Sequence, residues 1–180
     1  VRIVGAHSRS VRDLQITGDR IGLRVDQGDL SIEGVWIAGT KVCGLGGHAE
    51  TGSLSIQVEG LATTDIRSSD AHAMSTLLGP NPWGQGIGIV QVNDPTVKLS
   101  ATLKRIWTRD TGSGGLAVSG IRDAERTAPQ YLLRDVVSEG AGQNPVGGGG
   151  VLLAVTVADL QRIYVRGVTG GNALSFDRSE

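Results

Sequence analysis

The sequence is poor in the residues that most often reveal a chemistry. Among its 180 residues there are one cysteine, three tryptophans, two tyrosines and one phenylalanine. The single cysteine, Cys43, excludes an intrachain disulfide and a CxxC metal site. The 17 basic and 18 acidic residues leave a net charge of −1, so no field attracts nucleic acid or an anionic membrane. No apolar run is long enough for a transmembrane helix.

Glycine, by contrast, is in excess. The chain has 28 glycines, about twice the usual share. They do not recur at every third position, which excludes collagen, and the ordinary apolar content with a small net charge excludes disorder. The length favours one domain covering residues 1–180. Because the chain begins at Val1 rather than Met, we expect a segment of a longer protein.

A repeated pattern accounts for many of these glycines. Each unit has a core position, a second core position three residues later, and a Gly or Asp four residues after that. The first positions are Val11, Ile32, Thr63, Leu103, Leu133 and Leu160, and the second are Leu14, Val35, Ile66, Ile106, Val136 and Ile163. The third positions are Gly18, Gly39, Asp70, Asp110, Gly140 and Gly167. Gly and Asp favour turns, so each unit is predicted to be a strand followed by a turn.

A second short strand is expected in each unit, and no helical periodicity is present. The candidate segments are Gly22–Val25, Ser53–Ile56, Gly86–Ile89, Gly115–Val118, Gly150–Leu153 and Ala173–Phe176. Short strands without helices predict an all-β solenoid of about six rungs, whose stacking buries columns of Val, Ile and Leu. The nearest alternative, a leucine-rich repeat, needs an Asn at a fixed position that no unit has.

The units include LSIEGVWIAG, LKRIWTRDTGSGGLAVSG, LLRDVVSEG and LQRIYVRGVTGG. From about Val11 to Phe176 the chain resembles bacterial right-handed parallel β-helix repeat proteins of the pectin-lyase-like superfamily. The resemblance implies a single-stranded right-handed parallel β-helix. Many members are secreted or surface proteins, so it also implies an extracellular or cell-surface location. Some members are polysaccharide lyases or hydrolases, and others have no assigned activity.

One column of side chains is predicted to carry aromatic rings outward. The residues directly after the second core positions are Gln15, Trp36, Arg67, Trp107, Val137 and Tyr164. Strand alternation points them away from the core. Trp36, Trp107 and Tyr164 are therefore candidates for stacking on sugar rings, with Arg67 beside them. The alternative is that the rings pack under a loop or a neighbouring domain.

A pair of carboxylates is the second candidate site. Asp70 and Asp110 share a position in successive units, which places them about 5 Å apart. Such a pair suits a retaining glycosidase or a bound Ca²⁺, with Arg109 or Arg67 stabilising charge. The alternative is that both Asp residues are turn formers and that Arg109, Glu139 and Arg166 form a surface ion ladder.

Three long loops are expected to project on one side as a binding face. They are Thr40–Gly52, Ala71–Gln85 and Ala141–Gly149. The middle loop contributes His72 and Trp83 as candidate binding residues, although a loop histidine is often a solvated polar residue. The three histidines lack metal-ligand spacing, so no metal site is expected beyond the possible Ca²⁺.

Two hypotheses remain open. The first is a non-catalytic β-helix segment of a secreted or surface protein that presents a face or loops to a glycan or a protein partner. The second is a polysaccharide lyase or glycoside hydrolase that uses Asp70 and Asp110, although the RxPxxR, NTD, DD, GHG and RIK motifs expected of such enzymes are missing. Neither end has a clear polar cap, so we expect the isolated segment either to associate end to end or to need its neighbouring segments.

Overall fold

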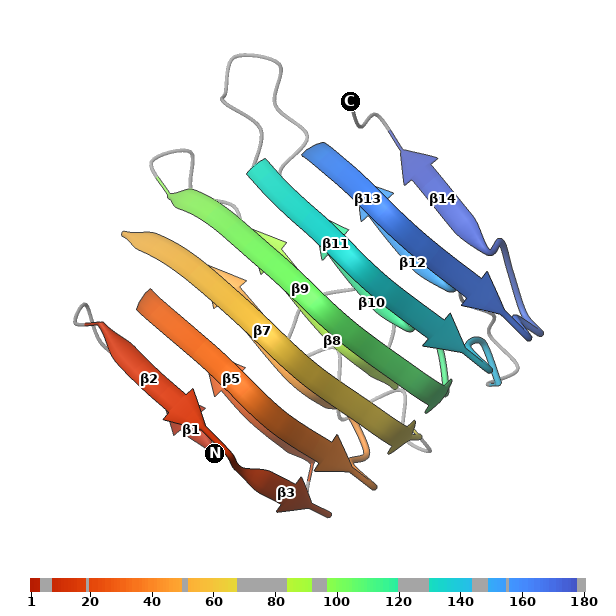
Figure 1. Cartoon of the computed structure of the whole chain (residues 1–180), viewed down its shortest axis with the longest axis horizontal. Helices are drawn as coiled ribbons and strands as arrows, with labels where there is room; N and C mark the ends of the chain where they lie inside the picture. Colours follow the sequence, from red (N-terminus) through yellow and green to blue (C-terminus); the bar gives the residue numbers. More distant parts are fainter. Residues whose placement is uncertain are drawn as a thin grey trace.

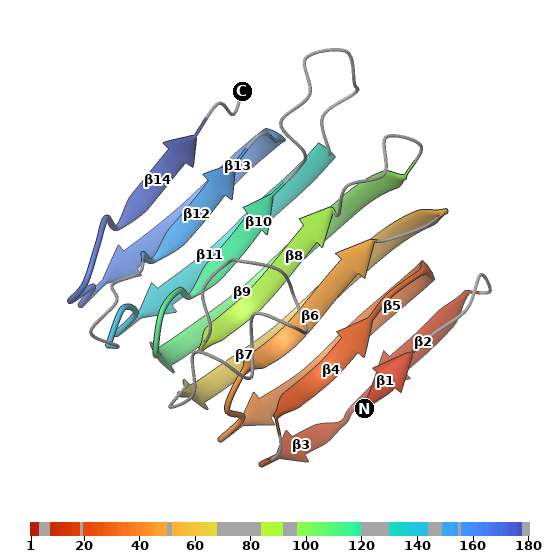
Figure 2. The same cartoon turned by 180° about the vertical axis from the view of Figure 1, so that it is seen from behind.

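The computed structural model describes residues 1–3, 8–18, 20–49, 52–67, 84–91, 97–119, 130–143, 149–154 and 156–177. Within these residues all regular elements are β-strands, arranged in two sheets whose pairings are all parallel (Figures 1 and 2). The first sheet, sheet A, contains β1 (Arg2–Ile3), β4 (Ile21–Val25), β6 (Cys43–Ala49), β8 (Gln85–Gln91), β10 (Leu116–Ser119), β12 (Val151–Ala154) and β14 (Leu174–Asp177). The second, sheet B, contains β2 (Arg9–Arg12), β3 (Gln15–Thr17), β5 (Gly28–Ala38), β7 (Ser53–Ile66), β9 (Lys98–Thr111), β11 (Gln130–Glu139) and β13 (Val157–Arg166).

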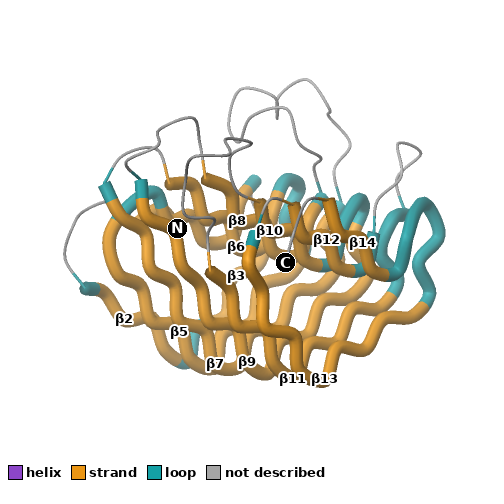
Figure 3. The backbone as a smooth tube through the Cα atoms, turned by 90° about the horizontal axis from the view of Figure 1, so that it is seen from above, coloured by secondary structure: helices purple, strands orange, loops and turns teal. Residues whose placement is uncertain are grey.

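Successive strands lie in alternate sheets, apart from β2 and β3, which both pair with β5. We number the repeats by their sheet B strands: repeat 1 has β2 and β3, and repeats 2 to 6 have β5, β7, β9, β11 and β13. Figure 3 shows the two sheets as two rows of strands. The prediction of an all-β fold with parallel strands is confirmed.

The core lies between the sheets and consists of columns of aliphatic side chains. In sheet A one column contains Leu23, Leu45, Ile87, Leu116 and Val151, each 0% exposed. The facing sheet B column contains Ile32, Val58, Leu103 and Leu133, each exposed by 2% or less. Burying one such side chain contributes about 1.5–3 kcal/mol before conformational entropy is subtracted.

A left-handed residue explains why core positions recur three residues apart. Side chains alternate along a regular strand, so residues three apart point to opposite faces. Yet Leu103 and Ile106 are both buried, because Arg105 between them has a φ of 53° and turns the chain. The same position is left-handed in all six repeats and forms the first bend column: Asp13, Gly34, Gly60, Arg105, Asp135 and Arg162.

A second bend column follows five residues later. It contains Gly18, Gly39, Asp65, Asp110, Gly140 and Gly167, with φ between 52° and 75°. Glycine adopts this backbone without a Cβ penalty, and Asp is one of the few other residues that tolerate it. The Gly-or-Asp position predicted from the sequence is therefore a left-handed bend.

The third repeat departs from the predicted alignment by five residues. The prediction aligned Thr63 with Ile32, but the structure pairs Ile32 with Val58, which in turn pairs with Leu103. As a result Asp65 occupies the bend position that the sequence analysis assigned to Asp70.

The alignment error of five residues equals the number of residues between the first bend and the second bend. Strand β7 carries the same pattern twice, a buried pair three residues apart around a left-handed residue. In β7 the buried residues Thr63 and Ile66 enclose Asp65 at the second bend. The pair Val58 and Leu61 encloses Gly60 at the first. Sequence spacing cannot tell the two bends apart.

The predicted loop Thr40–Gly52 is wrong, because it contains strand β6. All seven β6 residues are buried, and the strand pairs with β4 and β8. Its sequence, CGLGGHA, has too few bulky side chains to show strand alternation. The segment Ser53–Ile56, predicted as the second strand of this unit, instead begins β7 of sheet B.

Several of the glycines lie where neighbouring backbone and the side chains of sheet B leave no room for a Cβ atom. Gly22, Gly44, Gly86, Gly115 and Gly150 share one column just before or within the sheet A strands. A Cβ on Gly86 would lie 2.6 Å from the Gly115 carbonyl oxygen and 2.9 Å from Thr108 Cγ2. Across from these glycines sheet B presents small side chains, among them Thr63, Thr108 and Ser138. The glycine excess therefore reflects close approach of backbone and side chains as well as bends.

We predict that Gly115→Ala destabilises the fold by about 1–3 kcal/mol, the usual cost of overpacking. The new Cβ would lie 2.6 Å from Thr108 Oγ1 and 2.7 Å from the Gly150 carbonyl oxygen. Gly46→Ala is the matched control, because its Cβ would meet no atom closer than 3.9 Å. Chemical denaturation measures both variants, and equal stabilities would contradict the close-approach explanation.

We also predict that Arg105→Gly stabilises the protein by about 1 kcal/mol, because a left-handed backbone costs an ordinary residue about 1–2 kcal/mol. Arg105→Ala isolates this term: it removes the exposed ion pair to Glu59, 3.1 Å between Nη2 and Oε1, but keeps the backbone cost. Thermal unfolding should rank the glycine variant above the alanine variant. The opposite order would contradict the role of the bend.

Candidate functional site

The predicted outward column of aromatic side chains is present on sheet B. Parallel pairing aligns Trp36 with Ala62, Ala62 with Trp107, Trp107 with Val137 and Val137 with Tyr164. We call these five residues the aromatic column. Trp36 is 43% exposed, Trp107 38% and Tyr164 53%. The column thus presents a ring on every second repeat with a smaller side chain between rings.

Side-chain contacts hold two of the rings. Trp36 Nε1 donates a hydrogen bond to Thr64 Oγ1 at 3.2 Å, one repeat away. Trp107 Nε1 donates to Glu139 Oε2 at 3.3 Å, again one repeat away. Because neighbouring parallel strands lie about 4.8 Å apart, the rings recur about every 9.6 Å along the stack.

Charged side chains follow the column two residues further along β9, β11 and β13: Arg109, Glu139 and Arg166. The Arg109 guanidinium lies 6.0 Å from the Trp107 ring centroid, and Arg166 lies 6.0 Å from the Tyr164 ring. Arg166 Nη2 is 2.6 Å from Glu139 Oε1, so part of the predicted ion ladder forms. Arg109 Nε lies instead 3.2 Å from Asp110 Oδ2 in its own strand.

The third-repeat correction changes the membership of the aromatic column. Arg67, predicted to lie in it, is replaced by Ala62. Arg67 follows the second bend, where its Nε is 2.6 Å from Asp65 Oδ1, and both side chains are more than half exposed. An exposed pair of this kind contributes little stability.

The predicted carboxylate pair is only half described. The position beside Asp110 in the second bend column belongs to Asp65, so the register that gave this position to Asp70 is wrong. Asp70 itself lies outside the described residues, and a catalytic role for it stays a prediction. Asp110 Oδ1 accepts a hydrogen bond from Gln143 Nε2 at 3.2 Å, in addition to its contact with Arg109. His72 and Trp83 also lie outside the described residues. Among the residues that are described, no three His, Cys, Asp or Glu side chains gather as metal ligands would.

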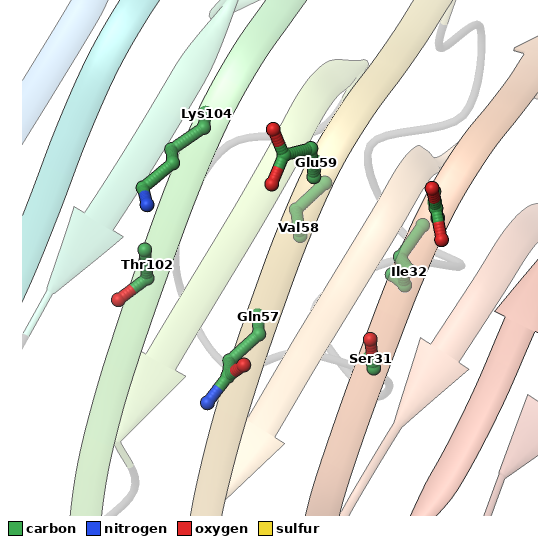
Figure 4. A pocket seen from close by; sticks show the side chains of 8 residues that line it. Ser31, Ile32, Gln57, Val58, Glu59, Thr102 and Lys104 are labelled. Atoms are coloured by element: carbon green, nitrogen blue, oxygen red, sulfur yellow. The ribbon is translucent and has the colours of Figure 1, made fainter.

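A polar depression on sheet B was not predicted. It has a volume of about 180 Å³ and crosses β5, β7 and β9. Figure 4 shows Ser31, Gln57, Glu59, Thr102 and Lys104 around it. It lies in the first halves of these strands, whereas the aromatic column lies in the second halves, beyond the first bend.

Register creates this depression. Ser31 pairs with Gln57 and Gln57 with Thr102, so three polar side chains from distant segments form one row. Glu33 and Glu59 form a neighbouring row, in which each carboxylate binds an arginine: Arg12 Nε is 3.3 Å from Glu33 Oε2. In the sequence, the sign of this depression is the alternation of polar residues along each strand. The misaligned third repeat kept these residues from being matched across the strands.

Comparisons of the chain with protein-family models, with curated proteins and with solved structures found no match. The part of the chain that the structure describes has no helix long and apolar enough to cross a membrane. The case for a function therefore rests on the side chains themselves.

The reactivity of the Cys43 thiol tests whether β6 is a buried strand. The thiol is 0% exposed, and burial raises its pKa from 9.0 to about 12. We predict that the native protein resists alkylation near pH 8, whereas the denatured chain reacts readily, because the thiolate is the nucleophile. A thiol that stays neutral in the fold but ionises in the unfolded chain also lowers stability as pH rises between these two pKa values. Native labelling as fast as that of the denatured chain would contradict a buried β6.

Proposed function

We propose that the chain is a non-catalytic binding segment of a secreted or surface protein and that its outward sheet B face binds an extended polysaccharide. We also propose that the fold is a right-handed parallel β-helix of the pectin-lyase-like kind. Strands that alternate between two parallel sheets, with two bend columns recurring in all six repeats, support this finer assignment.

One observation carries the functional proposal: exposed rings recur on alternate repeats. Trp36, Trp107 and Tyr164 stand in one column at intervals of about 9.6 Å. An extended polysaccharide repeats its orientation about every two sugar units, a period close to this interval. Each ring would stack on one sugar, with the polymer lying along the stack and the unit between rings crossing Ala62 or Val137.

Polar groups beside the rings suit sugar hydroxyls. Thr64, Arg109, Glu139 and Arg166 flank the column two residues along their strands. Carboxylate and guanidinium groups form the stronger, charge-assisted hydrogen bonds, and guanidinium nitrogens bind in pairs. The polar row Ser31, Gln57 and Thr102 lies on the outward side of sheet B before the first bend. Stacking faces with hydrogen-bonding groups alongside are the chemistry that recognises a carbohydrate.

A binding role also fits the state of the carboxylates near the column. Glu139 is shared between Trp107 and Arg166, and Asp110 between Arg109 and Gln143. Carboxylates occupied in this way are suited to fixing side chains in place. We therefore favour binding over hydrolysis. Many structural polysaccharides lie outside the cell or on its surface, which is where we propose that the segment acts.

We predict that Trp107→Ala weakens retention on a matching immobilised polysaccharide by about five- to tenfold, as expected for loss of one stacking contact of about 1–1.5 kcal/mol. Trp36→Ala and Tyr164→Ala should weaken it to a similar degree. Val157→Ala, which changes another exposed apolar residue of sheet B outside the column, should leave retention unchanged.

Oligosaccharide length provides the sharper test. Affinity for fragments of the retained polymer should rise in steps until the fragment spans all three rings, about five sugar units, and then level off. In Trp107→Ala the steps should collapse, because the two outer rings are too far apart for a short fragment. Retention that none of the three substitutions alters would refute the proposal, and selective loss of a protein ligand would replace the polysaccharide by a protein partner.

A further inference from the structure

Two depressions on the outward side of sheet B join into one trough. The polar depression of about 180 Å³ described above shares Ser31 and Gln57 with a second depression of about 360 Å³. The second depression reaches Ser8 and Arg9 at repeat 1, and the first reaches Thr102 in repeat 4. We call the two together the polar trough. It crosses the first halves of successive strands, so it runs along the stack beside the aromatic column.

Uncharged hydrogen-bonding groups run along this trough. Four hydroxyl groups line it, those of Ser8, Ser31, Ser55 and Thr102, together with the Gln57 amide. Hydroxyl and amide groups both donate and accept hydrogen bonds. The lining has no aromatic ring, so a ligand in the trough is held by hydrogen bonds rather than by stacking. Such a lining suits a ligand that is itself rich in hydroxyl groups.

The charged residues that line the trough are of both signs. Arg9 and Lys104 are basic, whereas Asp29, Glu33 and Glu59 are acidic. The Asp29 carboxylate accepts a hydrogen bond from a serine hydroxyl at 3.3 Å, and each glutamate is paired with an arginine of a neighbouring repeat. Mixed and paired charges select neither an anion nor a cation, so the trough favours a neutral ligand.

The first bend column separates the trough from the aromatic column, and it has a gap in repeats 2 and 3. In repeats 1, 4, 5 and 6 this column carries Asp or Arg side chains, whereas repeats 2 and 3 have Gly34 and Gly60. Ser31 and Gln57, which the two depressions share, lie in the same two repeats. The gap therefore connects the middle of the trough with the aromatic column.

The glutamates beside this gap turn to opposite sides. Glu33 Oε2 lies 3.3 Å from Arg12 Nε of repeat 1, and Glu59 Oε1 lies 3.1 Å from Arg105 Nη2 of repeat 4. Figure 4 shows Glu59 extending toward the strand that carries Lys104. Each carboxylate is held toward a repeat outside the pair, which leaves the passage over the two glycines open.

On the other side of the passage the aromatic column has its smallest side chain, Ala62 of repeat 3. The proposed function places over this residue the sugar unit that stacks on no ring. Gln57 lies five residues before Ala62, at most about 17 Å along the strand, which roughly three sugar units can span. A group attached to the sugar over Ala62 can thus reach the trough.

We propose that the polar trough binds a neutral side branch of the polysaccharide whose backbone lies on the aromatic column. The branch leaves the backbone over Ala62, crosses the bend at Gly60 and forms hydrogen bonds with Ser31, Gln57 and Thr102. This inference rests on the proposed polysaccharide-binding function and narrows its ligand to a branched neutral polymer. Because a bound backbone holds the branch near the trough, a few hydrogen bonds suffice to retain it.

Calorimetric titration with matched oligosaccharides tests the proposal. The pairs have the same β-1,4-linked backbone and differ in branching: cello-oligosaccharides with xyloglucan oligosaccharides, and manno-oligosaccharides with galactosylated manno-oligosaccharides. The protein should bind the branched member of at least one pair about three- to tenfold more tightly than the linear member, as expected for about one net hydrogen bond.

Variants separate binding of the branch from binding of the backbone. Gln57→Ala with Thr102→Ala should remove the preference for the branched member. Gly60→Arg should also remove it, because it fills the passage with the residue that repeats 4 and 6 carry at this bend.

Two controls should keep the preference. Gly60→Ala carries the same left-handed backbone cost as Gly60→Arg but leaves the passage open, and its Cβ would meet no atom closer than 3.5 Å. Gln130→Ala removes an exposed glutamine from the first half of β11, outside the trough. Circular dichroism checks that each variant retains its strands.

Equal affinity for the two members of every pair would overturn the proposal, as would a preference that survives Gly60→Arg or the double substitution. Methyl galactoside or methyl xyloside that binds the trough as tightly as the branched oligosaccharide would replace the branch by a separate saccharide. Trp107→Ala keeps the two proposals apart, because it should lower the affinity for linear and branched members by the same factor. If it does so while no pair shows a preference, only the branch is refuted. If it changes neither affinity, both proposals fail.

Discussion

In-register pairing between like positions is the constraint on which the rest of the structure depends. Each strand lies parallel to its counterpart one repeat away, so a residue stacks on the residue that plays the same part in the next repeat. A backbone requirement at one position therefore recurs in every repeat. The two bend columns are the clearest case, because all twelve of their residues have positive φ and most are Gly or Asp. The core columns recur for the same reason, since one Leu buried at 0% exposure needs an aliphatic neighbour above and below it.

Close approach of the sheets adds a second constraint. The column of glycines in sheet A leaves space for the side chains of Thr63, Thr108 and Ser138, which are fully buried. The hydroxyl groups of Thr63 and Thr108 have no hydrogen-bond partner. A buried hydroxyl without a partner costs free energy. Small side chains such as Thr nevertheless fit opposite the glycine column, where Leu would not. At this place the requirement for a small side chain therefore outweighs the free-energy cost of the unpaired hydroxyl groups.

On the outward face the same regularity underlies the proposed ligand site. On the inside, stacking like residues produces a core, and on the outside it produces evenly spaced rows. Rings on alternate repeats form a row whose period a polymer can match, whereas a compact small molecule would meet one ring only. Contacts such as Trp107 with Glu139 cross from one repeat to the next, so they orient the rings and also couple neighbouring repeats.

The sequence by itself determined the repeat, the absence of helical periodicity, the core spacing of three residues and the outward place of Trp36, Trp107 and Tyr164. These follow from local chemistry, because alternation and turn preference act within a few residues. Prediction from the sequence failed where one local pattern occurs twice. Thr63 and Val58 are equally good starts for the third repeat, and only the observed pairing of Val58 with Ile32 identifies Val58 as the start. It also failed at β6, where glycine is required by neighbours distant in the chain. The polar row Ser31, Gln57 and Thr102 depends on the register between neighbouring repeats, which only the tertiary structure decided.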